Sequence, residues 1–408
     1  MKRSSRWVLG PQWWVQGLLF TLGTLLLSGP ASAASVEEDD EESIPSDMSF
    51  SVPAEVLAAK KDSAGQNGFS LLLGASAFLG TDANIYRSPT SAEHDSHAWG
   101  NWGYLRSDAR WKRNRMLTTA NWKQTQYPGH SAVNANYGHV SNWITRPLGR
   151  RLDLEVDLDL SHQNDDAVKI DGTKYDRRYG YWRSSAEAVL EWNPGRHHRL
   201  RVSGEGLRKN YDETPGLNSL DWHQVAGRAE YRYRFASSHY LDMGYAVANR
   251  RYRAEPASIR AGDELPSNPT EHHRYREATV GYNVPMTRGL SAHSSYAYAD
   301  KRDLFEGYEN FRRRQGALGI DLKLTSALSL SADAEHANTD YDHLHGDHGR
   351  ALRYRTWDVG LGSRLRGNQS CWLFGSVGYY ERRSNKSFGT LYRDYHGILT
   401  RLGLSVFF

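Results

Sequence analysis

Residues 340–350 form a dense group of potential metal ligands. They read DYDHLHGDHGR. Imidazole and carboxylate groups are ligands for zinc or copper, and His343 and His345 would share one face of an extended chain. The stretch is also polar and contains glycine, which is typical of a solvated loop. We therefore expect a solvated loop and no metal site here. His343, His345 and His348 are the weak candidates for metal ligands.

The run His94-Asp95-Ser96-His97 contains the side-chain types of an acyl hydrolase. No G-x-S-x-G nucleophile motif accompanies it, and the sequence has no glycine-rich phosphate loop. The one cysteine, Cys371, excludes an intrachain disulfide and a thiolate metal cluster. We expect no catalytic residues and no cofactor.

Charged and aliphatic residues alternate in several segments, most regularly in Leu152–Leu160, where every second residue is a carboxylate. A strand places such alternating residues on opposite faces. If the aliphatic face contacts lipid, the charged face lines a water-filled interior and biases which solutes pass. The same charges can instead pair across strands and stiffen the wall. The residues predicted to line this interior are Asp153, Glu155, Asp157, Asp159, Arg183, Glu187, Arg201, Arg228, Arg232, Arg364 and Arg401.

The elements that would position these side chains are strands, because the period of two continues from Phe69 onward. Seven short turns are predicted near residues 112–115, 147–150, 193–196, 236–239, 286–289, 325–328 and 367–370. Eight longer polar loops are predicted near residues 87–98, 125–132, 161–178, 209–219, 254–271, 303–311, 340–354 and 384–392. These connections imply sixteen strands. One hairpin more or fewer would give eighteen or fourteen.

An even number of strands with alternately short and long connections indicates a closed, antiparallel, all-β transmembrane barrel of the bacterial outer membrane. Tryptophans near predicted strand ends, such as Trp143, Trp182 and Trp192, would form its aromatic girdles. A secreted sandwich or propeller is the soluble alternative. It would have shorter strands and would not separate the two strand faces along the whole chain.

The sequence divides into three regions. Residues 1–33 have a basic start, an apolar core and an Ala31-Ser32-Ala33 cleavage site, which indicates a secretory signal peptide. Residues 34–66 carry nine acidic and two basic side chains, and we expect a disordered periplasmic segment. Residues 67–408 would form the barrel. Although the mean hydropathy is −0.70, a barrel with a polar interior is compatible with that value.

The last eight residues, RLGLSVFF, read as the final strand. It must pair with the first strand near Phe69 to Thr81, because an open edge in lipid leaves backbone groups unsatisfied. Both termini would then be periplasmic. A terminal Phe408 resembles the signal that the outer-membrane assembly machinery reads. The partners expected are that machinery and the outer-membrane lipids of a Gram-negative cell. The net charge is +8 once residues 1–66 are removed, but it is distributed over a barrel, so we expect no nucleic-acid partner.

Residues 82–89 read DANIYRSP. This resembles the D-x-N-[IV]-[FY]-R stretch that ends the first strand of porin-like barrels encoded with exopolysaccharide synthesis and export genes. The resemblance implies a conduit for an extended polysaccharide and a periplasmic export protein as a partner, since 34–66 is too short for the helical-repeat domain of some relatives. Two alternatives stay open: a surface scaffold or adhesin with an occluded lumen, and an outer-membrane barrel enzyme.

Overall fold

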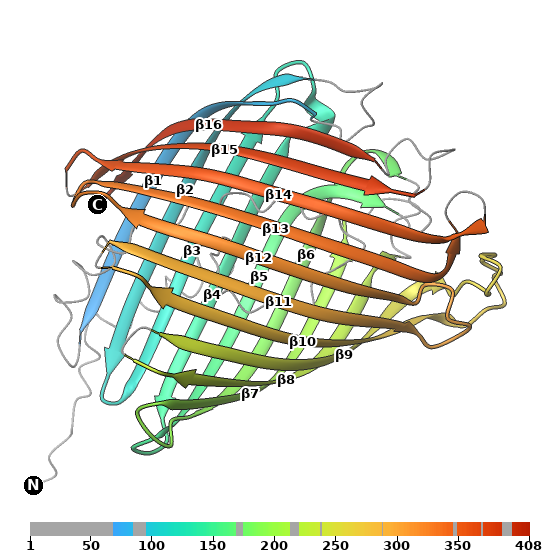
Figure 1. Ribbon diagram of the computed structural model, residues 1–408, viewed down its shortest axis with the longest axis horizontal. Helices are drawn as coiled ribbons and strands as arrows, with labels where there is room; N and C mark the ends of the chain where they lie inside the picture. Colours follow the sequence, from blue (N-terminus) through green and yellow to red (C-terminus); the bar gives the residue numbers. More distant parts are fainter. Residues whose placement is uncertain are drawn as a thin grey trace, which may run out of the picture.

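The chain forms sixteen antiparallel strands that close into one barrel, in which each strand pairs with its sequence neighbours and β1 pairs with β16 (Figure 1). The computed structural model describes residues 68–84, 95–168, 174–212, 220–236, 239–287, 289–345, 349–368, 370–385 and 394–408. The fold class and strand number predicted from the sequence are confirmed. The predicted signal peptide, 1–33, and acidic segment, 34–66, lie outside the described residues.

The strands differ in length but not in kind, and most are long enough to cross a bilayer when tilted. They are β1 (Phe69–Asp82), β2 (Ser96–Trp111), β3 (Asn114–Gln126), β4 (Ala135–Pro147), β5 (Leu152–Val168), β6 (Lys174–Trp192), β7 (His198–Tyr211), β8 (Trp222–Arg234), β9 (Tyr240–Pro256), β10 (Thr270–Pro285), β11 (Leu290–Asp303), β12 (Phe311–Lys323), β13 (Leu328–His345), β14 (Ala351–Arg366), β15 (Cys371–Ser384) and β16 (Tyr395–Phe407). Among the described residues the one complete helical turn is a 3-10 turn, Ser131–Val133, and no helix there could cross a membrane.

The connections separate the two ends of the barrel. The links that follow even-numbered strands are short at one end, which we call the short-turn end. Most of the links that follow odd-numbered strands are longer, and they lie at the opposite, long-loop end. The tightest short turn, between β2 and β3, places Lys112 at a φ of 55°. Such alternation is the pattern predicted from the sequence.

Two predicted loops are wrong in extent. Residues 161–178 and 340–354 were expected to be loops, but β5 runs to Val168, β6 starts at Lys174, β13 runs to His345 and β14 starts at Ala351. Their polar composition reflects strand ends beyond the apolar part of the barrel, where water satisfies the side chains while the backbone pairing continues. The β13–β14 pairing also shifts register between Asp340 and His345.

The first and last strands close the barrel. Their register runs from Gly74 opposite Phe407 to Asp82 opposite Leu399. Phe408 extends this pairing, because its N–H donates to the Leu73 carbonyl at 2.8 Å and its carbonyl accepts from the Leu73 N–H at 3.2 Å. The predicted pairing of the C-terminal strand with the first strand is therefore confirmed, and no strand edge remains open.

The two faces of the barrel wall differ in exposure. In β1, Leu71, Leu73 and Leu79 are exposed, whereas Leu72 and Phe78 on the other parity are buried. The same alternation leaves large apolar side chains exposed on many other strands. In a closed barrel the exposed apolar parity marks the outer face. We therefore call the opposite parity the interior face.

Candidate functional site

Charges on the interior face of β5, β6, β7 and β8 join in one ion-pair network near the short-turn end. Arg201 donates to Glu155 at 2.9 Å and lies 3.6 Å from Glu191 and 3.8 Å from Glu230. Glu230 in turn lies 3.5 Å from Arg228. Each of these side chains shares the parity opposite to the exposed apolar residues. The structure thus brings Glu155, Arg201 and Arg228 together.

Arg232, on the same face of β8, forms a separate pair. Its Nε lies 2.5 Å from Asp242 Oδ1 on β9, and its Nη2 lies 2.9 Å from Oδ2. This is a two-pronged arginine–carboxylate contact, which is the strongest geometry for such a pair. Arg232 and Asp242 therefore stiffen the wall between β8 and β9, as the alternative reading of the sequence pattern allowed.

Three carboxylates form a row that lacks this compensation. Asp157 on β5 lies opposite Glu187 on β6, and Glu187 lies opposite Glu205 on β7. Within the described residues, none of the three has an ion-pair partner. Like charges directly opposite each other are destabilising. Arg183 and Arg228 act on Glu205 from a distance, so the row gathers negative charge on the interior face beside these two arginines.

The remaining predicted residues are distributed around the interior face. Asp159 lies 3.0 Å from His139 of β4. Arg401 lies over the Phe78 ring at 5.3 Å. Asp153 lies opposite Glu191, Arg183 opposite Ser161, and Arg364 on β14 opposite Phe374. Asp153 therefore borders the network around Arg201 through Glu191, whereas Arg364 on β14 and Arg401 on β16 lie away from it.

A second group of interior charges, at the long-loop end, is almost fully buried. We call Lys209, Arg250 and Lys301, which are 1%, 1% and 0% exposed, the inner cation belt. Their cationic groups lie over aromatic rings: Lys209 is 3.8 Å from the Tyr181 centroid, and Arg250 is 4.2 Å from that of Trp222. Desolvated cation–π contacts of this kind are stabilising.

The belt continues from strand to strand. Tyr275 on β10 lies between two cations, 4.8 Å from Arg250 and 5.9 Å from Lys301. Lys301 lies opposite Phe311 of β12, and its ammonium is 5.6 Å from that ring. Phe311 packs with Tyr341, the next ring along the wall. Rings and cations thus alternate from β6 to β12, and a second ring follows on β13.

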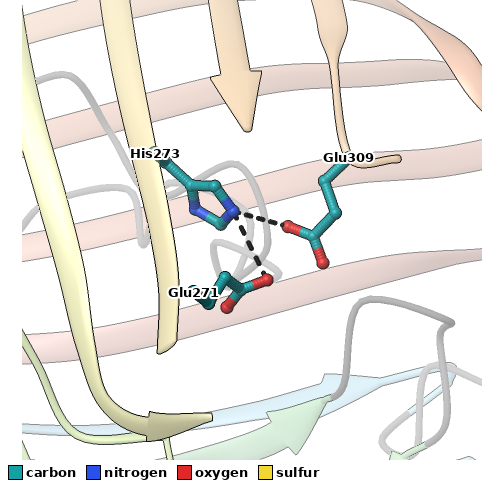
Figure 2. A group of neighbouring side chains, drawn as sticks. All are labelled: Glu271, His273 and Glu309. Atoms are coloured by element: carbon teal, nitrogen blue, oxygen red, sulfur yellow. Dashed lines mark ion pairs between the residues drawn. The ribbon is translucent and has the colours of Figure 1, made fainter. Parts of the chain in front are cut away.

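Lys301 also belongs to a buried ion cluster. Its other members, Glu271, His273 and Glu309, are shown in Figure 2. His273 Nε2 lies 2.9 Å from Glu309 Oε2 and 3.3 Å from Glu271 Oε1. The Lys301 ammonium donates to Glu309 at 3.1 Å. Glu309 comes from the β11–β12 connection, so the cluster anchors that loop to the wall formed by β10 and β11.

The cluster has the donor types of a metal site, because ligand atoms of Glu271, His273 and Glu309 lie within 4.8 Å of one another. A metal ion would have to share the Glu309 carboxylate with Lys301. Burial acts to raise the pKa of Glu309, but the charges of Lys301 and His273, with hydrogen bonds from His273 and Glu271, outweigh it and hold that pKa well below its usual range. The carboxylate is therefore already matched by cations of the protein itself.

The predicted metal candidates have a different environment. His343 and His345 are part of β13, half-buried and exposed respectively, and His348 lies outside the described residues. Among the described residues neither joins a group of metal-ligand geometry. The sequence reading missed the Glu271 cluster. The alternating Glu271-His272-His273 was a local sign of it, but Glu309 reaches the cluster only through the fold.

Residues Asp82 and Asn84, which carried the family resemblance, form a buried lock at the seam between β1 and β15–β16. The Tyr380 hydroxyl donates to Asp82 Oδ1 at 2.7 Å and to the Asn84 carbonyl at 3.1 Å. The Asn84 side-chain amide donates to the His396 carbonyl at 3.1 Å. Asp82 and Asn84 are 2% and 0% exposed, so these two side chains hold the seam. Residues 85–89 of the motif lie outside the described residues.

The sequence matches no protein-family model and no curated protein. Among solved structures, the chain is similar to OprB of Pseudomonas putida, with 9% identity, a TM-score of 0.48, and coverage of 86% of this chain and 96% of that one. An anion-selective porin from Comamonas acidovorans gives 9% identity, a TM-score of 0.47, and coverage of 84% and 100%. A bacterial polysaccharide outer membrane secretin gives 11% identity, a TM-score of 0.44, and coverage of 84% of this chain and 99% of that one. At these values the similarities carry no functional assignment.

Proposed function

We propose that this protein is an outer-membrane barrel of a Gram-negative cell, with a hydrated, charged passage through its interior. The single observation that carries the proposal is the separation of faces in a closed barrel. Apolar side chains are exposed on one parity, while an ion-pair network and the row of three carboxylates occupy the other. Sixteen-stranded barrels are wide enough to hold water, and charged walls keep that water in place.

The substrate that we favour is an exopolysaccharide in export. Sugar hydroxyls need many weak polar partners, which interior arginine, carboxylate and tyrosine groups supply. The resemblance around Asp82 and Asn84 supports the same substrate class. A periplasmic polysaccharide export protein would deliver the chain to the short-turn end of the barrel, and both termini would lie on that side.

Single-channel recording in planar bilayers tests the passage. We expect discrete current steps, with cations preferred over anions because of the carboxylate row. The double variant Glu187→Gln/Glu205→Gln should lower that preference and keep the conductance, whereas Asp263→Asn/Glu264→Gln, which removes two exposed loop charges, should not change it. Absence of current steps from correctly folded protein would contradict the proposal.

The export role has its own test. Deletion of the gene should reduce the polysaccharide released at the cell surface, and expression of the intact chain should restore it. An unchanged polysaccharide coat in the deletion strain would reject this substrate while leaving the passage itself to the conductance measurement.

One observation favours a second function, a surface scaffold with an occluded lumen. The inner cation belt is at most 1% exposed, and the ion cluster holds the β11–β12 loop against the interior wall. Side chains so deeply buried are inaccessible to a passing solute. A barrel that remains closed in bilayers but binds cell-surface material through its loops would support the scaffold.

We also propose that Phe408 is the assembly signal. It is 69% exposed and completes the seam through two backbone hydrogen bonds with Leu73. Its deletion should lower the amount of barrel in the membrane, measured by heat-modifiable mobility on gels, without changing the conductance of molecules that do assemble. Deletion with no loss of assembled barrel would contradict this role.

A further inference from the structure

The outer face carries its own group of cations at the long-loop end. Six arginines on β7, β9, β10, β12 and β14 are exposed there, and we call them the outer arginine band: Arg208, Arg251, Arg274, Arg276, Arg314 and Arg355. Each shares the parity of exposed apolar residues on its own strand, and none has an ion-pair partner within the described part of the chain. The band is therefore an uncompensated positive surface.

Neighbouring acids do not neutralise the band, because other arginines already hold them. Asp300 pairs with Arg302 at 2.9 Å, and Asp342 pairs with Arg312 at 3.2 Å. Asp340 is bonded in the same way by Arg353. The positive charge of the band is thus in excess of the local carboxylates.

The strand register makes like charges meet at two positions of the band, whereas Arg276 lies opposite Asp300, which is already paired with Arg302. Arg274 lies directly opposite Arg302, and Arg355 lies directly opposite Arg383. Arg302 is held by Asp300 and Arg383 by Glu381, so neither acid pairs with Arg274 or Arg355, and like charges directly opposite each other repel. Arginine is the cation in every case, while Lys209 on β7 and Lys301 on β11 are buried on the interior face. The planar guanidinium can bind phosphate oxygens in a two-pronged manner, which lysine cannot do.

The height of the band identifies the anion as a lipid headgroup. On β14, Trp357 and Val359 follow Arg355 along the same face and are exposed. On β12, Leu318 and Ile320 follow Arg314 in the same way. A rise of roughly 3.3 Å per residue places Arg355 about 7 Å from Trp357 along the strand. Cation, ring and aliphatic side chain follow in the order of headgroup, interface and hydrocarbon.

We propose that the outer arginine band binds the phosphate groups of anionic lipids in the leaflet around the long-loop end. This inference rests on the membrane location proposed above, but not on an open passage. Each basic side chain near a charged membrane surface strengthens binding roughly fivefold, so three of them contribute on the order of 100-fold.

The test uses the full barrel in nanodiscs of phosphatidylcholine, either alone or doped with lipid A or phosphatidylglycerol, and counts retained lipids by native mass spectrometry. The variant Arg274→Gln/Arg276→Gln/Arg314→Gln should lose anionic-lipid retention on the order of 100-fold. The control Arg113→Gln/Arg150→Gln/Arg196→Gln removes the same charge from exposed positions at the short-turn end and should retain the lipids.

Heat-modifiable mobility checks that each variant is folded. Equal retention by wild type and the band variant would overturn the inference, as would equal loss in both triple variants. Displacement of lipid A by millimolar inorganic phosphate would identify a free-phosphate site instead. Because retention is measured without current, a barrel that binds lipid but does not conduct would reject the passage and leave this inference intact.

Discussion

The long-loop ends of β7–β14 and of β2–β5 have the same antiparallel backbone pairing but carry different polar side chains. In the first sector cations occupy both faces: Arg250 is buried on the interior face, and the next residue, Arg251, is exposed on the outer face. In the second sector the outer face carries amides. Asn164 there accepts from the Asn136 N–H at 2.5 Å and donates to the Asn134 carbonyl.

This difference shows that the burial of a charge, and not its presence, decides its role. The inner cation belt is compensated by rings and by Glu309, so it stabilises the wall. The outer arginine band has no such compensation in the described part of the chain, so it remains available for a ligand. The amides of β3–β5 are used in contacts between neighbouring strands. They carry no net charge to attract an anion.

The largest effect should follow from breaking the buried ion cluster. Lys301→Met leaves the Glu309 carboxylate buried without its ammonium partner, and loss of one member of such a pair costs about 3–5 kcal/mol. Denaturant unfolding followed by tryptophan fluorescence would measure this loss. Arg314→Gln, an exposed position of the outer band, should change stability by less than about 0.5 kcal/mol. Equal effects would remove the distinction between the two cation groups.

The cluster also predicts a pH dependence. The folded pKa of Glu309 is lowered, so its stabilising contribution is complete above the unfolded glutamate value of about 4.3 and is lost as the pH falls towards the lowered value. The stability difference between wild type and Glu309→Gln should therefore shrink on acidification below about pH 4.3. A difference that grows in acid would mean that the carboxylate is not charged in the folded barrel.

A smaller effect separates two adjacent arginines. Arg250→Ala removes a guanidinium that donates to Gln224 at 3.1 Å and lies between two rings, so we expect a loss of about 2–3 kcal/mol. Arg251→Ala should be nearly neutral in the same unfolding experiment. Similar losses would show that the two faces at this height are not distinguished by burial.

The smallest effect concerns the seam. Tyr380→Phe removes the hydroxyl that donates to Asp82 and Asn84, which should cost about 1–2 kcal/mol and lower the temperature at which the barrel loses its heat-modifiable mobility. Tyr296→Phe, on the exposed face of β11, should leave that temperature unchanged. An equal loss of stability in Tyr296→Phe would mean that the effect does not come from the hydrogen bonds at the seam.

The period of two was sufficient to predict sixteen strands and the closure of β16 on β1, because register and burial follow from alternation. The extent of the strands was not predictable at 161–178 and 340–354, where polar strand ends have the composition of loops. Composition reports the solvent around a side chain, and it does not report whether the backbone is still paired.

The sequence predicted which face the interior charges occupy, but not which of them form ion pairs. Alternation assigned Glu155 and Arg201 to one face, but their pairing depends on the register across β5, β6 and β7. Glu309 had no local signal, since it belongs to a connection and is recruited by His273 and Lys301. Asp82 and Asn84 were recognised as a motif, while their contact with Tyr380 required the closed barrel.

The seam has a consequence for the order of folding. The hydroxyls of Thr81 and Thr400 meet at 2.8 Å although 319 positions separate them in the chain. Contacts of such sequence separation pay the greatest loss of chain entropy and form slowly. We expect hairpins of neighbouring strands to form early and the β1–β16 pairing to form last. The Asp82–Asn84–Tyr380 lock therefore marks the completion of folding, and the lifetime of the native state should depend on this one junction more than on any internal hairpin.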